Sequence, residues 1–243
     1  MITASLLPFL LILGQWGMGP GPGLPASSGS SSPTVAVTCY EGSSSFTHTI
    51  SGVNDSGAEA LFVAVTSFNS TGGQVTVSHN PGSSANLTSI TPFSDANSPS
   101  SQFFYITSPA TSSSDTFTIN GSSPGLYDTT CIFVVSGISG TYLTANNNVT
   151  ASSSCSSSSC QPGSISPSGS NVVVMACFGT YTSSGTPSIN DSFTGLAYNA
   201  GAGGTAYAEY CGYLIQTTGT AVNPTGSWNG SASTPTGMIA AVK

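Results

Sequence analysis

Residues 60–68, ALFVAVTSF, decide the fold class of this chain. In an extended strand, neighbouring side chains point to opposite faces, and here both alternating sets are mainly apolar. The segment is therefore expected to form a central strand that is buried on both faces. Residues 171–177, NVVVMAC, repeat this pattern and predict a second central strand.

Outward from these two segments, short runs rich in Val, Ile, Phe, Tyr and Thr alternate with clusters of Gly, Ser, Asn and Pro from Thr34 onward. No apolar stripe with the period of a helix lasts for about ten residues. We expect an all-β fold, a jelly-roll-like antiparallel β-sandwich preceded by an extended N-terminal peptide. Residues 115–120, DTFTIN, alternate apolar and Thr side chains, which predicts a half-exposed edge strand where a partner's strand could add.

The two halves of this β region resemble each other. HTISG, ALFVAVTSF and TFTINGSS run parallel to SISPSG, VVVMACFG and GSWNGSAS at an offset of about 110 residues, so that Asn120 falls on Asn229. This similarity predicts two duplicated Greek-key halves that close into one sandwich, each half supplying strands to both sheets. Weak self-similarity is also common in Ser- and Thr-rich β chains, so both interpretations stay open.

Charge is nearly absent from the chain. Its 243 residues include 47 Ser, 30 Thr and 29 Gly, against one Lys, no Arg and eight acidic residues. A charged fraction of 4% beside 38% hydrophobic residues excludes a charge-driven disordered tail. Nucleic acid binding is excluded as well, because neutralising phosphates requires clustered Lys and Arg, and the only cation is Lys243. A chain almost without tryptic sites is typical of a protein exposed outside the cell or on a particle. Compositional drift in the genome is the alternative explanation of this composition.

Six cysteines form an even set, which predicts disulfides that cross-link a fold already possessing a core. One pair is separated by only four serines and is expected to be local, while the other four cysteines can pair in three ways. The favoured pairs are Cys155–Cys160, Cys39–Cys131 and Cys177–Cys211. Free thiols in a reducing compartment are the alternative. Because the chain has no CxxC pair and no His–Cys cluster, no metal site is expected.

Seven Asn-x-Ser/Thr sequons are present, against roughly four or five expected by chance in so Ser- and Thr-rich a chain. N-glycosylation is therefore a hypothesis for the following residues: Asn54, Asn69, Asn86, Asn120, Asn148, Asn190 and Asn229.

Residues 1–17, MITASLLPFLLILGQWG, contain an apolar run that is too short to span a bilayer, which requires about 20 apolar residues. The run lacks both a preceding positive charge and a clear cleavage site, so it is either a signal peptide or a retained peptide that docks into a partner subunit. In the second case the docking residues are Leu6, Leu7, Phe9, Leu10, Leu11 and Leu13. Residues 18–33, rich in Gly, Pro and then Ser, predict a linker, and residues 34–243 the β-sandwich domain.

No constellation of residues indicates catalysis. His48 and His79 are the only candidate bases at neutral pH, and both are expected to be ordinary surface or strand-end residues. Asp55 is expected to bond its local backbone in a turn, and Glu209 to point to solvent from an edge strand. We therefore predict no catalytic residue, no metal and no cofactor, and the protein is not expected to be an enzyme.

Three segments carry a resemblance to known proteins: HTISG before ALFVAVTSF, the aromatic QFFYITSP, and the terminal GSWNGSASTPTGMIAAVK. Over residues 34–243 the pattern resembles a loose family of secreted and virion-associated β-sandwich domains, jelly-roll-like or concanavalin-like in fold. The resemblance implies an extracellular adhesion or structural module, or a component of a phage particle. The chain departs from the family in its extra cysteines and its near absence of charge.

Two hypotheses of function follow. The first is a non-enzymatic structural subunit on the exterior of an assembly, either a virion decoration or fibre protein or a cell-surface filament, joined to other copies or other subunits through residues 1–17. The second is a secreted carbohydrate-binding or adhesive module that stacks a glycan on Trp228, Tyr210 and Tyr213. Both hypotheses place the protein outside the cell or on a virion surface.

Overall fold

The computed structural model describes residues 32–41, 47–68, 75–80, 85–90, 100–121, 127–138, 155–181, 187–200, 207–229 and 233–243 of the chain. These residues form sixteen β-strands in four antiparallel sheets and no helix, which confirms the expected all-β fold and antiparallel sandwich. None of the described segments is a helix that could cross a membrane. The predicted docking residues and all but the end of the predicted linker lie outside the described residues.

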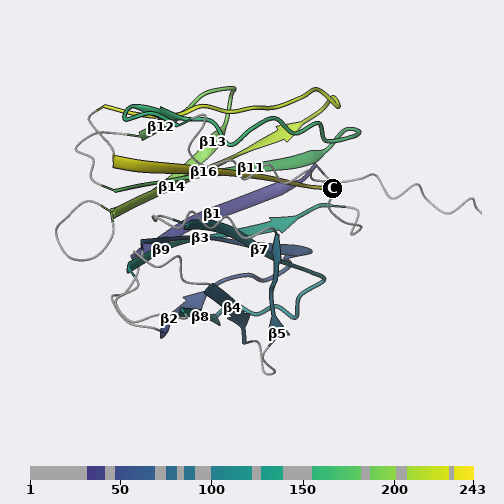
Figure 1. The fold of residues 1–243 in the computed structure, drawn as a ribbon. Helices are drawn as coiled ribbons and strands as arrows, with labels where there is room; N and C mark the ends of the chain where they lie inside the picture. The colour runs from purple at the N-terminus through teal and green to yellow at the C-terminus, as the bar shows by residue number, and fades with distance from the viewer. Residues whose placement is uncertain are drawn as a thin grey trace, which may run out of the picture.

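The first half of the body consists of two stacked sheets (Figure 1). Its inner sheet has the order β1-β9-β3-β7-β6, with strands Thr34–Glu41, Tyr127–Ser136, Ala60–Phe68, Ser100–Thr107 and Thr88–Ile90. Its outer sheet has the order β2-β8-β4-β5, with strands Thr47–Val53, Asp115–Gly121, Val75–His79 and Ala85–Asn86.

The second half is also a pair of sheets. Its inner sheet has the order β13-β14-β11-β16, with strands Thr194–Ala200, Tyr207–Gln216, Val172–Tyr181 and Ser233–Val242. Its outer sheet has the order β10-β15-β12, with strands Ser159–Cys160, Gly226–Trp228 and Pro187–Ile189. The two inner sheets pack against each other, so the body is a stack of four layers with β2, β8 and β4 at one end and β12 at the other (Figure 1).

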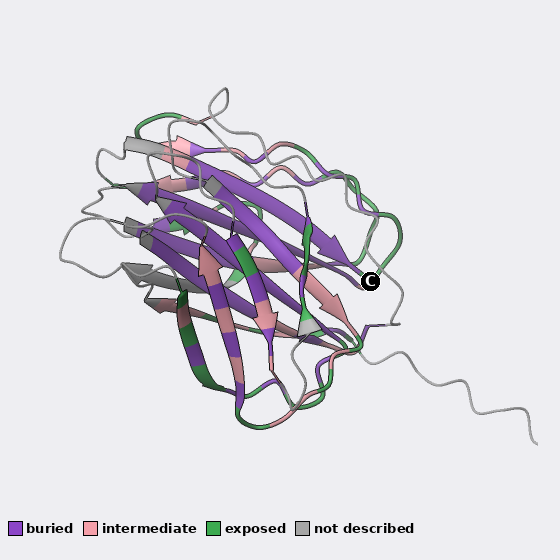
Figure 2. Cartoon of the chain, turned by 60° about the horizontal axis from the view of Figure 1, so that its bottom comes forward, coloured by how far each residue is buried: buried purple, intermediate pink, exposed green. Residues whose placement is uncertain are grey.

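Three apolar cores fill the spaces between the four layers. The middle core lies between the two inner sheets, and each outer core lies between an inner and an outer sheet. On β3, Leu61 and Val63 point into the first outer core while Phe62 and Ala64 point into the middle core. β11 divides its side chains in the same way, so both predicted central strands are confirmed. Buried residues accordingly make up β3 and β11, and Figure 2 shows the buried strands running through the middle of the body.

The strand order repeats between the halves. Both halves contain three outer strands in the orders β2-β8-β4 and β10-β15-β12, and three inner strands in the orders β9-β3-β7 and β16-β11-β14. The outer sheets also share a register, because the Asn80 N–H donates to the Thr116 carbonyl just as the Asn190 N–H donates to the Thr225 carbonyl. Within the described residues no sheet contains strands of both halves, so the expectation that each half supplies strands to both sheets of one sandwich is wrong.

The expected position of residues 115–120 is also corrected. These residues form β8, which lies between β2 and β4 rather than at an edge. Phe117 and Ile119 are fully buried in the first outer core. Both edges of β8 are therefore occupied, and it cannot accept a partner's strand.

Candidate functional site

Three disulfides cross-link the body, in the pairs that the sequence favoured: Cys39–Cys131, Cys155–Cys160 and Cys177–Cys211. The first joins β1 to β9 at directly opposite positions, and the third joins β11 to β14 in the same manner. Disulfides persist in oxidising compartments, so these three indicate an extracellular or otherwise secreted environment.

The two inner-sheet disulfides meet in the middle core. The Sγ atoms of Cys39, Cys131 and Cys211 lie within 4.8 Å of one another. These sulfur atoms are consumed in disulfides and are not thiolates, which are the form that binds metals. The cross-link of one half therefore packs against that of the other, where it contributes apolar contact rather than a metal site.

β1 is the strand through which the chain enters the body. It pairs with β9 over eight register positions, from Thr34 opposite Ser136 to Glu41 opposite Thr129. The hydroxyls of Thr34 and Ser136 are hydrogen-bonded at 2.7 Å. Val35 and Val37 pack against the middle core. An edge strand is thus held by pairing, by packing and by the Cys39–Cys131 cross-link.

A buried carboxyl lies between the two inner sheets. Glu209 is fully buried on β14, and its Oε1 accepts a hydrogen bond of 2.9 Å from the Thr66 hydroxyl of β3. The Thr66 hydroxyl is also hydrogen-bonded to Ser101, and Ser101 to Thr236, so one network joins four strands, β3 and β7 of the first half and β14 and β16 of the second. Oε2 of Glu209 has no hydrogen-bond partner within the described part of the chain.

The environment of Glu209 corrects the expectation that it faces solvent. β14 lies between β13 and β11, and the Glu209 side chain points toward the first half rather than outward. Burial raises the pKa of this carboxyl well above its usual range, and the charge of Asp128 raises it further, while the hydrogen bond from Thr66 acts in the opposite direction. The neutral, protonated form of Glu209 is therefore favoured.

A second polar cluster lies at one end of the first half. Nε2 of His79, the last residue of β4, is 2.8 Å from Asp55 Oδ2 and 3.2 Å from Asp115 Oδ2, and all three residues are buried. The Ser112 N–H donates to Asp55 at 2.8 Å, and the Ser112 hydroxyl donates to Asp115 at 2.6 Å. The His79 ring also stacks on Phe117, with 4.6 Å between centroids. The cluster thus joins the β2–β3 turn to the ends of β4 and β8.

The two carboxyls of this cluster differ. Burial raises the pKa of Asp55. Burial also opposes ionisation of Asp115, but hydrogen bonds from Ser112 and Asp55 together with the neighbouring imidazole lower its pKa. An imidazole and two carboxylates within 4.8 Å are also a donor set that could hold a divalent cation. In the arrangement observed, however, the His79 ring is hydrogen-bonded to both carboxyls.

Both histidines were expected to be surface or strand-end residues, and neither is exposed. His79 does end β4 but is fully buried, because Asp55 and Asp115 approach it from segments distant in sequence. His48 is half-buried on β2, with Nδ1 3.1 Å from Asp128 Oδ2. Asp55 lies in a turn as expected, but its side chain bonds the backbone of a segment 57 residues away.

The aromatic residues proposed for glycan stacking belong to the cores. Trp228 is 4% exposed and Tyr210 is 1% exposed, and the two rings pack edge to face in the second outer core. The Trp228 ring N–H donates to the Ser157 carbonyl at 2.7 Å. Tyr213 is half-buried against the middle core. The faces of Trp228 and Tyr210 are therefore closed to a glycan, and sequence could not show this because an aromatic strand serves either a core or a surface.

The sequons fall in different environments. Asn69 and Asn148 lie outside the described residues, Asn120 is half-buried, and the exposed ones are Asn54, Asn86, Asn190 and Asn229.

No protein-family model, curated protein or solved structure matches the chain.

Proposed function

We propose that this protein is a non-enzymatic structural subunit displayed on the exterior of an extracellular assembly, as a virion decoration or fibre protein or as part of a cell-surface filament. Residues 1–17 dock into other copies of the chain or into other subunits, and residues 18–33 link them to the body. The observation that carries the proposal is the attachment of β1, the strand at which the linker meets the body.

A pull on the N-terminal residues reaches the body at Thr34, the first residue of β1. The eight paired positions of β1 and β9 resist this pull first. Beyond them, the Cys39–Cys131 disulfide is a covalent bond that the loss of hydrogen bonds does not release. β9 lies between β1 and β3, so the force passes to the centre of the first inner sheet.

The distribution of charge supports an exterior position. Four of the eight acidic residues, Asp55, Asp115, Asp128 and Glu209, are buried in the body. The surface is therefore left mainly to Ser, Thr, Asn and Gly, whose contacts depend little on salt. A surface of this kind, with one Lys in the whole chain, offers little to trypsin-like proteases.

The N-terminal residues supply enough apolar surface for durable docking. Seven large apolar side chains lie from Leu6 to Leu13, the six predicted docking residues and Ile12. Burying each in a neighbouring subunit contributes about 1.5–3 kcal/mol before the entropic cost of ordering the peptide.

The test is incorporation of a shortened chain into the assembly. A variant lacking residues 1–17 is produced beside the full chain in the source of the protein, and the two are counted by mass spectrometry in purified particles. We expect the shortened chain to be absent from particles yet to unfold at the same denaturant concentration as the full chain. Equal incorporation of both chains, or an intact mass showing that the assembled subunit lacks residues 1–17, contradicts the proposal.

A further inference from the structure

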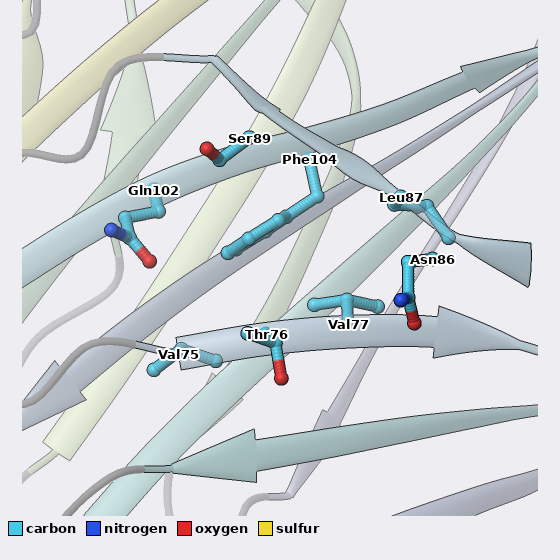
Figure 3. Close-up of a pocket in the computed structure, with 8 residues that line it drawn as sticks. All are labelled: Val75, Thr76, Val77, Asn86, Leu87, Ser89, Gln102 and Phe104. Carbon is cyan, nitrogen blue, oxygen red and sulfur yellow. The ribbon is translucent and has the colours of Figure 1, made fainter.

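β4 places an imidazole where the alternation of the strand predicts an apolar side chain. Its buried residues are Val75, Val77 and His79, and Thr76 is exposed between the two valines. Figure 3 shows Val77 pointing toward Phe104 while Thr76 points away from it. Since every second side chain of a strand shares a face, His79 points to the same side of the outer sheet as the two valines. A polar ring therefore occupies a core position.

The cavity beside this face of β4 is separate from the imidazole. It has a volume of about 280 Å³ and lies between β4 and β7, and His79 does not line it (Figure 3). Gln102 Oε1 is buried beside the cavity without a hydrogen-bond partner among the described residues. The Phe104 ring in its lining is 2% exposed and packs in the first outer core, so it offers no face to a ligand. The polar contacts of His79 lie instead at the end of β4.

Two carboxylates converge on one nitrogen of this imidazole. Nε2 of His79 is hydrogen-bonded to Asp55 Oδ2 at 2.8 Å and to Asp115 Oδ2 at 3.2 Å. A single N–H cannot point directly at both oxygens, whereas one ion placed between the three atoms can contact all of them. The Ser112 N–H donates to Oδ1 of Asp55, and the Ser112 hydroxyl donates to Oδ1 of Asp115. Both Oδ2 atoms are therefore held toward the ring.

The spacing of the three donor atoms fits a small divalent ion. All of them lie within 4.8 Å of one another. Zinc binds imidazole and carboxylate at about 2.0–2.2 Å, which places neighbouring donor atoms of a tetrahedral site about 3.3–3.5 Å apart. Nε2 lies 2.8 and 3.2 Å from the two oxygens, so the cluster admits this ion by opening less than about 1 Å. Calcium fits poorly, because it takes about six to eight oxygen ligands.

The position of Asp55 has an apolar counterpart in the second half. The Asp55 N–H donates to the Ser112 carbonyl at 3.1 Å, and the Ile165 N–H donates to the Val222 carbonyl at 2.9 Å. Both bonds join the segment before the central inner strand, β3 or β11, to the segment before the middle outer strand, β8 or β15. Asp55 therefore corresponds to Ile165, which is buried in the second outer core.

The other two positions also have apolar counterparts. The backbone bonds that give the outer sheets a shared register align His79 with Ile189 and Asp115 with Pro224. The second half thus closes the same corner without an ionisable group. Burying a carboxylate or an imidazole costs desolvation free energy that an apolar side chain does not cost. The three ionisable residues of the first half are therefore not required by the strand arrangement.

No other side chain of the chain supplies positive charge to the two carboxylates. There is no Arg, and the single Lys, Lys243, lies beside Gly169 in the second half. His48, the only other histidine, is paired with Asp128. Three groups of donor atoms in the described residues are close enough to share a metal ion, and this is the one that contains no disulfide sulfur.

We propose that Asp55, His79 and Asp115 bind one zinc ion through Oδ2, Nε2 and Oδ2. The ion takes the place of the proton on Nε2, and water completes the coordination, as in other zinc sites with three protein ligands. Ser112 orients both carboxylates from outside the coordination shell. The bound ion joins the β2–β3 turn to the ends of β4 and β8. The site is independent of the anchoring role of residues 1–17.

The test measures zinc binding to the full chain with its three disulfides formed. No thiol competes for the ion in this form, because all six cysteines are paired. The protein is freed of metal with a chelator, dialysed, and titrated with zinc chloride in competition with a chromophoric zinc chelator. We expect one ion per chain and a higher urea midpoint of unfolding when zinc is present.

Two variants each remove one ligand at similar volume, His79→Gln and Asp115→Asn. Each should weaken zinc binding by at least about tenfold, since even the loss of an outer-shell partner typically has this effect. His48→Gln is the matched control, because it removes the other imidazole, which also lies beside a carboxylate. The control should bind zinc like the wild type, and the ligand variants should lose the zinc-dependent rise of the urea midpoint.

Imidazole NMR makes the test independent of whether the ligand variants fold. The chain has two histidines, so the His48→Gln spectrum assigns both signals of the wild type. Zinc should shift the His79 signal and leave the His48 signal in place. The proposal is overturned if micromolar zinc does not bind the wild type, if zinc shifts only the His48 signal, or if both ligand variants bind zinc as tightly as the control.

Discussion

Removal of the Cys39–Cys131 disulfide should destabilise the body more than removal of either other cross-link. The three disulfides close segments with sequence separations of 92, 34 and 5 residues, in the order Cys39–Cys131, Cys177–Cys211 and Cys155–Cys160. Loop-closure entropy of the unfolded chain then gives contributions of about 4.6, 3.8 and 2.1 kcal/mol. The entry strand β1 would thus lose its strongest constraint.

The assay is equilibrium unfolding in urea of the wild type and three double Cys→Ala variants, without reductant. Cys131, Cys160, Cys177 and Cys211 are fully buried, so each variant also leaves a small cavity. Because these cavity costs are similar, the difference of about 2.5 kcal/mol between the longest and shortest loops measures the cross-link. The slope of the unfolding free energy against urea concentration should also be larger for the variant without Cys39 and Cys131, since its unfolded state exposes more surface.

The reduced wild type is the control, and it should be less stable than any double variant. Because the middle core joins both halves, the wild type should unfold in one transition. An equal loss of stability in the variants of the five-residue and the 92-residue loops would show that loop closure does not set the contribution of these disulfides.

Three further predictions concern the buried polar groups and one close backbone contact. The raised pKa of Glu209 means that its contribution to stability is complete below the ordinary value of 4.5 and is lost as the pH rises to the folded value. Over this pH range the unfolding free energy of the wild type should fall by up to about 1.4 kcal/mol per pH unit, and Glu209→Gln should remove this fall. An unchanged pH profile in the variant would mean that Glu209 is not its source. His79→Ala should cost about 3–5 kcal/mol in urea unfolding, because two buried carboxyls lose their imidazole; a loss below about 1 kcal/mol would mean that the cluster is not a structural link. Gly226→Ala should destabilise by at least about 1–3 kcal/mol in thermal unfolding, since its Cβ would lie 2.5 Å from the Phe178 ring and 2.7 Å from the Tyr210 hydroxyl. A stable Gly226→Ala protein would show that these rings can move aside.

The arrangement of the layers was partly readable in the sequence. In a two-layer sandwich each strand has one buried face, whereas ALFVAVTSF has two. A strand of this kind requires layers on both sides, which the four-layer stack provides for β3 and β11. The repeat offset was visible too, but a pattern of similar segments does not state which segments pair.

The all-β class, the central position of β3 and β11, and the local pairing of Cys155 with Cys160 could be predicted from the sequence alone, because alternation and short spacing are properties of neighbouring residues. The burial of Glu209, which raises the pKa of its carboxyl, and the position of His79 between two carboxyls follow from the tertiary structure alone. The same holds for the amide oxygen of Gln102, which is buried beside a cavity without a hydrogen-bond partner among the described residues. The environment of each of these side chains is made by strands distant along the chain, and no local pattern records which polar residue such strands will enclose.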